Sequence, residues 1–99
     1  MARQRFTVQR RTAGKQVVLQ PGVYRLRKTV RLRPGVALVG AVDGGRRPVL
    51  LAETEPCLAG TGGRNIVCPR CGRLLVSGLG EGDVSGVTVR CVCGFEVSL

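Results

Sequence analysis

Apolar and polar residues alternate along the first half of the chain. Between positions 24 and 32 one parity holds apolar side chains and the other holds mostly arginines; the apolar set is Tyr24, Leu26, Val30 and Leu32. Because successive side chains of a β-strand point to opposite faces, this pattern predicts strands with one apolar and one arginine-rich face. Lys28 interrupts the apolar set, which indicates a bend between two short strands.

Short apolar runs surround this alternating stretch, at 17–19, 36–39 and 49–51. Their length and composition are typical of strands that are buried on both faces. Pro-Gly pairs at 21–22 and 34–35 separate the runs and favour turns, because Pro presets φ and Gly accepts positive φ. No segment shows helical periodicity of useful length. The pattern therefore predicts an all-β protein.

A five-residue motif repeats once, as Leu-Gln-Pro-Gly-Val at 19–23 and Leu-Arg-Pro-Gly-Val at 32–36. The stretch 21–51 resembles the opening rungs of right-handed parallel β-helices of the pectate-lyase type. The matching residues are Pro21, Gly22, Val23, Tyr24, Leu26, Pro34, Gly35, Val36, Leu38, Val39, Gly40, Val49 and Leu50. The resemblance implies a strand-and-turn pattern with room for two rungs, and it implies no polysaccharide-cleaving activity. A small antiparallel barrel or sandwich explains the same pattern.

Charge and cysteine are distributed unequally along the chain. The net charge is +10, from 16 Lys and Arg against 6 Asp and Glu, and Asp43 is the only acid in residues 1–52. All five cysteines lie in the second half. Residues 53–64 change composition abruptly, with two acids, a proline and three glycines. We therefore predict a basic β-rich module at 1–52, a linker at 53–64 and a second module at 65–99.

The cysteines form two short pairs. Cys68 and Cys71 belong to a Cys-Pro-Arg-Cys-Gly motif, and Cys91 and Cys93 belong to a Cys-Val-Cys-Gly motif further along the chain. A tight turn with two thiolates and a following glycine is typical of a zinc knuckle, and two knuckles supply a tetrahedral four-sulfur site. We expect a structural Zn²⁺, because four protein thiolates leave no coordination position for water. Cys57 is expected to be a buried or linker thiol, and it stays a candidate substitute ligand because Cys-x-Cys is tighter than the usual Cys-x-x-Cys.

Two other interpretations of the cysteines stay open. A redox Cys-x-x-Cys normally begins a helix in a βαβ context, and structural disulfides require an oxidising compartment. The sequence shows neither that context nor a signal peptide, because no apolar segment follows its basic N-terminus. No apolar run approaches the roughly 20 residues of a membrane span. We expect a cytoplasmic protein without membrane contact, or alternatively a virion component.

Residues 65–99 look like a zinc ribbon, in which strands at 73–77, 86–90 and 95–99 flank the two knuckles. Within that class the opening Asn-Ile-Val-Cys-Pro-Arg-Cys-Gly-Arg-Leu-Leu at 65–75 is similar to the Com-type zinc ribbons of Mu-like prophages. The resemblance implies RNA binding and a phage-type regulatory role.

The absence of histidine restricts the chemistry. There is no His-based acid or base and no Ser-His or Cys-His pair, so we expect no enzyme activity and no small-molecule substrate. Arginine binds phosphate through its planar fork, which favours a nucleic-acid partner bound by phosphate contacts that weaken with salt. The arginines expected to bind it are Arg10, Arg11, Arg25, Arg27, Arg31, Arg33, Arg46 and Arg47.

A second function fits the same features. A structural or assembly protein, such as a phage capsid or tail component, would dock its basic β-rich module on an acidic protein surface or on its own copies. Its zinc ribbon would then serve as a structural staple, and the protein would form homo-oligomers or join a virion.

Overall fold

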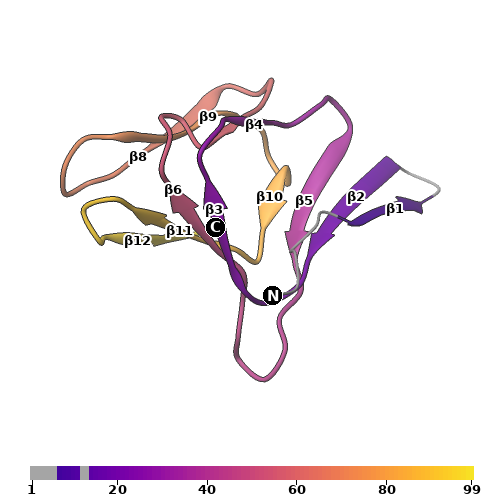
Figure 1. Cartoon of the computed structure of the whole chain (residues 1–99). Coiled ribbons are helices and arrows are strands. Elements are labelled where there is room, and N and C mark those ends of the chain that lie inside the picture. Colours follow the sequence, from indigo (N-terminus) through magenta and orange to yellow (C-terminus); the bar gives the residue numbers. More distant parts are fainter. Residues whose placement is uncertain (1–6, 12–13) are drawn as a thin grey trace.

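Figure 1 shows the computed structural model, which describes the backbone of residues 7–11 and 14–99 and the side chains from residue 16 onward. The described residues form twelve short strands and no helix. None of their segments is therefore a helix of the length and apolarity that crossing a membrane requires. The all-β class predicted from the hydrophobic pattern is confirmed.

The strands are arranged in three four-stranded sheets. Sheet A contains, in spatial order, β1 (Thr7–Arg11), β2 (Gly14–Leu19), β5 (Val36–Gly40) and β10 (Val84–Ser85). Sheet B contains β12 (Glu96–Ser98), β11 (Thr88–Cys91), β6 (Val49–Ala52) and β3 (Val23–Leu26). Sheet C contains β4 (Val30–Arg31), β7 (Leu58–Ala59), β9 (Leu74–Leu79) and β8 (Arg64–Val67).

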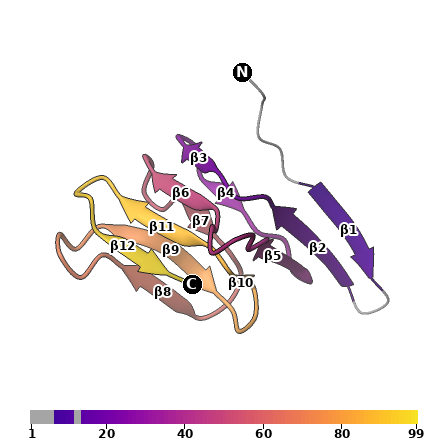
Figure 2. The same ribbon diagram turned by 90° about the horizontal axis from the view of Figure 1, so that it is seen from below.

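Three strands in every sheet are parallel, and they define the rungs of a short parallel β-helix. The chain passes through sheets A, B and C as β2, β3 and β4, and again as β5, β6 and β7. It then passes through sheets C, A and B as β9, β10 and β11, which form the third rung. Figure 2 shows the strands of each sheet stacked rung upon rung. β1, β8 and β12 are antiparallel additions at the sheet ends.

The core consists of side chains stacked in register through the rungs. In sheet B, Tyr24 lies beside Leu50 and Leu50 beside Val89, and all three are buried. Sheet C adds Leu58 beside Val76, both with no exposed area. Burial of a Leu or Val side chain contributes about 1.5–3 kcal/mol. One continuous cluster contains all of these residues, so the three rungs share a core.

The parallel pairing matches the β-helix-like interpretation of the first half and not the antiparallel barrel. The prediction of a separate three-stranded ribbon in residues 65–99 is wrong. β9 belongs to sheet C, whereas β11 and β12 belong to sheet B. These strands instead extend the sheets that residues 1–52 begin, because their apolar faces complete the shared core. Strand pairing also crosses the predicted linker, since β7 lies inside residues 53–64.

The repeated Pro-Gly motif marks corners of the coil. The pair at 21–22 lies between β2 and β3, and the pair at 34–35 lies between β4 and β5. Successive rungs are separated by more residues than the motif: Lys15 lies beside Val36 and Val23 beside Val49, spacings of 21 and 26 residues. The two turns also differ in backbone conformation, since φ is +157° at Gly22 and +78° at Gly35. The motif therefore does not set the period of the coil.

Candidate metal centre

Two tight turns carry the four paired cysteines. The first, at 68–72, joins β8 to β9, and the second, at 91–94, joins β11 to β12. Both turns lie side by side at the left of Figures 1 and 2. We call them the first and the second knuckle. They lie at opposite ends of the third rung along the chain, because β9 begins just after the first and β11 ends at the second.

A glycine closes each knuckle. Gly72 donates its N–H to the carbonyl of Cys68 at 2.8 Å, and Gly94 donates to the carbonyl of Cys91 at 2.9 Å. Their φ angles are +80° and +95°, a backbone conformation that favours glycine. A Cβ at either position would meet no atom within 4 Å, so glycine is favoured there by the backbone conformation and not by a lack of space.

The sulfur atoms of the two knuckles form one compact group. All four lie within 4.8 Å of one another. The Cys71 and Cys91 sulfurs are 3.4 Å apart, and the Cys68 and Cys93 sulfurs are 3.6 Å apart. A tetrahedral centre with metal–sulfur bonds of about 2.3 Å places its sulfurs about 3.8 Å apart, whereas a disulfide requires about 2.05 Å. The four cysteines, all free thiols, are therefore positioned to bind one metal ion.

The surroundings of the two buried thiols, Cys68 and Cys91, shift their pKa values in opposite directions. Burial raises the pKa of Cys91 to about 12. Burial acts in the same direction on Cys68, but hydrogen bonds from the backbone N–H groups of Cys71 and Arg70 and from the Cys93 thiol bring its pKa to about 6. N–H groups that point at a sulfur stabilise its thiolate form, which is the form that binds metal.

Residues outside the knuckles fix the start of β9. Glu55 accepts a hydrogen bond from the Leu74 N–H at 2.9 Å and forms an ion pair with Arg73 at 3.8 Å. Both contacts lie directly after the first knuckle. No local sequence pattern predicts this role of Glu55, because its partner Leu74 lies 19 positions away in the chain.

Cys57 does not belong to the metal-binding group. Its side chain is completely buried in the shared core, and burial raises the pKa of its thiol to about 11. The described cluster of candidate ligands contains the other four cysteines. This agrees with a buried thiol and not with a substitute ligand.

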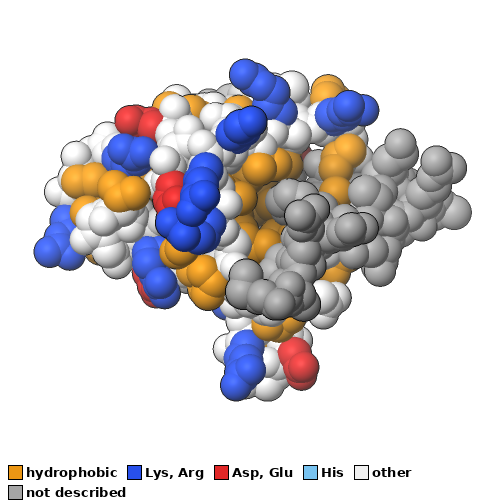
Figure 3. Space-filling view, in the orientation of Figure 1, with side chains coloured by type: hydrophobic (Ala, Val, Ile, Leu, Met, Phe, Trp, Pro, Cys, Tyr) orange, Lys and Arg blue, Asp and Glu red, His pale blue; other side chains and the backbone are white. Residues whose placement is uncertain are grey.

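The structure does not bring the predicted arginines onto a single strand face. Arg25 lies in β3 of sheet B, and Arg31 lies in β4 of sheet C. Both are exposed, as are Arg27, Arg33 and Arg46, while Arg47 is half-buried. Arg10 and Arg11 belong to β1, but their side chains lie outside the described part. Figure 3 shows basic side chains spread over one view of the surface.

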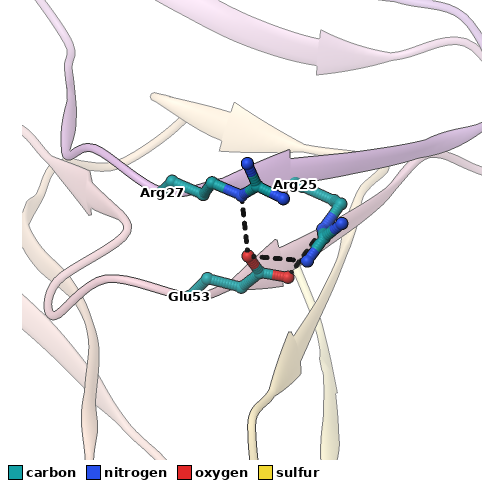
Figure 4. A network of polar contacts seen from close by, with 3 residues as sticks. All are labelled: Arg25, Arg27 and Glu53. Carbon is teal, nitrogen blue, oxygen red and sulfur yellow. Dashed lines mark hydrogen bonds and ion pairs between the residues drawn. The ribbon is translucent and has the colours of Figure 1, made fainter.

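Glu53 neutralises part of this charge, as Figure 4 shows. Its carboxylate accepts hydrogen bonds from Arg25 Nε at 2.9 Å and from Arg27 Nε at 3.3 Å. The Arg25 hydrogen bond is the main reason why the pKa of Glu53 is lowered, and Arg27 adds to the effect. Glu53 follows β6 immediately, so its place beside β3 comes from rung stacking. The charges of residues 1–52 alone do not predict this pairing, because Glu53 lies just outside that range.

Comparisons of the chain with protein-family models, with curated proteins and with solved structures find no match. The four-cysteine group and the exposed arginines are therefore the features from which a function can be inferred.

Proposed function

We propose that this chain is a non-enzymatic, zinc-stabilised protein that binds nucleic acid, with RNA as the expected form, through phosphate contacts of its arginines. The exposed excess of positive charge carries the proposal. The net charge is +10. Exposed Arg31, Arg33 and Arg46 take part in none of the ion pairs between described side chains.

Zinc is the metal that the donor set favours. Four thiolates in a tetrahedral arrangement suit Zn²⁺, and the sulfur separations of 3.4 and 3.6 Å are close to those of a four-thiolate zinc centre. Such a site is closed to water, so its role is structural. The resemblance of residues 65–75 to Com-type zinc ribbons supports both a zinc site and an RNA partner.

Phosphate-directed binding follows from the type of side chain and its surroundings. Arginine presents a planar set of N–H donors that matches two phosphate oxygens. Each arginine that neutralises a phosphate releases a counterion, so affinity falls steeply as the salt concentration rises. Even the arginines paired to Glu53 remain accessible, because the side chains of Arg25 and Arg27 are 59% and 67% exposed.

A pair of double variants with equal charge tests the proposal. Arg31 and Arg33 are exposed residues of the first half of the chain. Arg64 begins β8 and Arg70 lies within the first knuckle; both are exposed and form no ion pair among the described residues. R31E/R33E and R64E/R70E change the net charge equally. Fluorescence anisotropy with a labelled single-stranded RNA should show at least a tenfold loss of affinity for R31E/R33E and a smaller loss for R64E/R70E.

Salt provides the second measurement. The logarithm of the affinity should fall linearly with the logarithm of the salt concentration, with a slope of about −0.7 for each phosphate contact on a single strand. Binding that is absent at low salt, or equal losses in the two double variants, would contradict the proposal.

One observation favours the alternative of a structural or assembly protein. β3 and β4 are the last described strands of sheets B and C on the first-rung side. Such strand edges offer unpaired backbone N–H and C=O groups to another chain. Light scattering distinguishes the alternatives: a discrete oligomer that binds no RNA supports assembly, and a monomer that binds RNA with the expected salt dependence contradicts it.

A further inference from the structure

Each knuckle combines one buried and one accessible cysteine. Cys68 and Cys91 are 1% and 2% exposed, whereas Cys71 is exposed and Cys93 is half-buried. Two short sulfur contacts run between the knuckles, each from the accessible cysteine of one knuckle to the buried cysteine of the other. These contacts are Cys71 to Cys91 at 3.4 Å and Cys68 to Cys93 at 3.6 Å.

We propose that Cys71 is an oxidation site for hydroperoxides, and that oxidation of the centre forms disulfides across the two knuckles, Cys71–Cys91 and Cys68–Cys93, with release of the metal. A peroxide reacts with a thiolate that it can reach, which favours Cys71 over the buried sulfurs. The sulfenic acid formed there then has the Cys91 sulfur as its neighbour at 3.4 Å.

The chemistry balances with hydrogen peroxide as the oxidant. The Cys71 sulfur attacks one peroxide oxygen, an S–O bond forms as the O–O bond breaks, and the departing hydroxide takes a proton to become water. The Cys91 sulfur then attacks the sulfenic sulfur, an S–S bond forms, and the hydroxyl leaves as a second water. A second peroxide oxidises Cys93 and Cys68 in the same way. In total, two peroxides, four protons and the zinc tetrathiolate give two disulfides, Zn²⁺ and four waters.

The sulfur positions make this pairing accessible. Closing a contact of 3.4 or 3.6 Å to a disulfide of about 2.05 Å requires the sulfurs to approach by roughly 1.5 Å. Both disulfides would join the turn between β8 and β9 to the turn between β11 and β12. They connect the same two points of the chain as the metal. Oxidation therefore releases the metal while the ends of the third rung stay joined.

Disulfide mapping of the zinc-loaded protein tests the proposal. After treatment with hydrogen peroxide and alkylation of remaining thiols, the denatured protein is digested with trypsin without reduction. Cleavage after Arg70, Arg73 and Arg90 places Cys68, Cys71 and the Cys91–Cys93 pair on three separate peptides. Disulfides across the knuckles hold all three peptides together in one species, and fragmentation of that species identifies the pairs.

The competing outcome has a different mass. Disulfides within each knuckle would link only the peptides of Cys68 and Cys71, and the peptide with Cys91 and Cys93 would appear alone with an internal disulfide. That result overturns the proposal, as does a centre that loses zinc to peroxide without forming disulfides. A sulfenic-acid trap such as dimedone should label Cys71 before the other cysteines, and initial labelling of Cys68 or Cys91 would also overturn it.

Two further measurements complete the test. A zinc indicator should report metal release at the same rate for wild type and for C57S, because Cys57 is buried and lies outside the cluster. The oxidised, metal-free protein should melt at a higher temperature than the reduced protein treated with chelator, and an equal or lower melting temperature contradicts the retained connection. The disulfide map does not depend on RNA binding, so this proposal and the proposed function fail separately.

Discussion

The sulfur of Cys71 lies 3.4 Å from the sulfur of Cys91, although the two residues are 20 positions apart in the chain. The segment between them contains β9, β10 and β11, which together form the third rung. A metal ion held by both knuckles therefore closes this rung into a ring. The ring stacks on the second rung through parallel pairing in all three sheets.

Removal of the metal should open the third rung before the rest of the fold. Structural zinc contributes about 10–16 kcal/mol of apparent binding free energy in small zinc domains. Without it the third rung is held weakly in sheet A, because only two residues of β10 pair there. Hydrogen exchange with and without a zinc chelator should show protection lost mainly in residues 68–99. An equal loss of protection across residues 16–99, or no loss of protection, would contradict the prediction that the metal stabilises the third rung.

Gly72→Ala should destabilise the protein through the backbone alone. Gly72 has a φ of +80°, and an added Cβ would meet nothing within 4 Å. A left-handed conformation costs a non-glycine residue about 1–2 kcal/mol. Gly63→Ala is the matched control, because its added Cβ also meets open space and its φ is not in the left-handed range. Denaturant unfolding of the zinc-loaded proteins should show this loss in the free energy of unfolding for G72A and a change within about 0.5 kcal/mol for G63A. Equal effects of the two variants would contradict a backbone origin of the loss.

The strands of this fold could be predicted, but their partners could not. Alternation such as that of Tyr24 and Leu26 depends on neighbouring residues, so it appears in the sequence. Parallel partners lie at irregular distances: Val23 beside Val49 is 26 residues away, and Leu58 beside Val76 is only 18. Without a constant period the sequence does not reveal the third rung, and the local pattern of its strands predicts a separate ribbon.

The metal-binding group could be predicted because its information is local. Each pair of cysteines lies within four residues and precedes its own glycine, so the two turns are visible in the sequence. The contacts of Glu53 with Arg25 and of Glu55 with Leu74 depend on the stacking of rungs. Those contacts could be found only after the pairing of the strands was known.

Cys57 should make stability depend on pH above about 9. Its pKa is raised from 9.0 to about 11 by burial, so the folded state favours the neutral thiol. The stabilisation relative to the ionised form is complete below pH 9 and is lost as the pH rises from 9 toward 11, by at most about 3 kcal/mol. Urea unfolding at pH 8, 10 and 11 should show this decline for wild type and a shallower one for C57A. Equal declines in the stability of wild type and C57A would contradict the prediction that ionisation of Cys57 causes the loss.

Glu53→Gln should strengthen RNA binding if Arg25 and Arg27 contact phosphates. The carboxylate competes with phosphate for both guanidinium groups, and because exposed ion pairs are weak the gain in affinity should be small, about two- to fivefold. Glu81→Gln removes the same charge from an exposed residue without an ion pair among the described residues, and it should change affinity less. Equal gains in an anisotropy titration would place the RNA elsewhere.

X-ray absorption spectroscopy of the purified protein after zinc addition tests the central claim most directly. The account predicts one zinc per chain, bound by four sulfurs at about 2.3 Å. The variant C57S should give the same spectrum, because its thiol lies outside the cluster. Less than half an equivalent of zinc, or a shell in which oxygen replaces one or more of the sulfurs, would contradict the four-cysteine centre and the closure of the third rung.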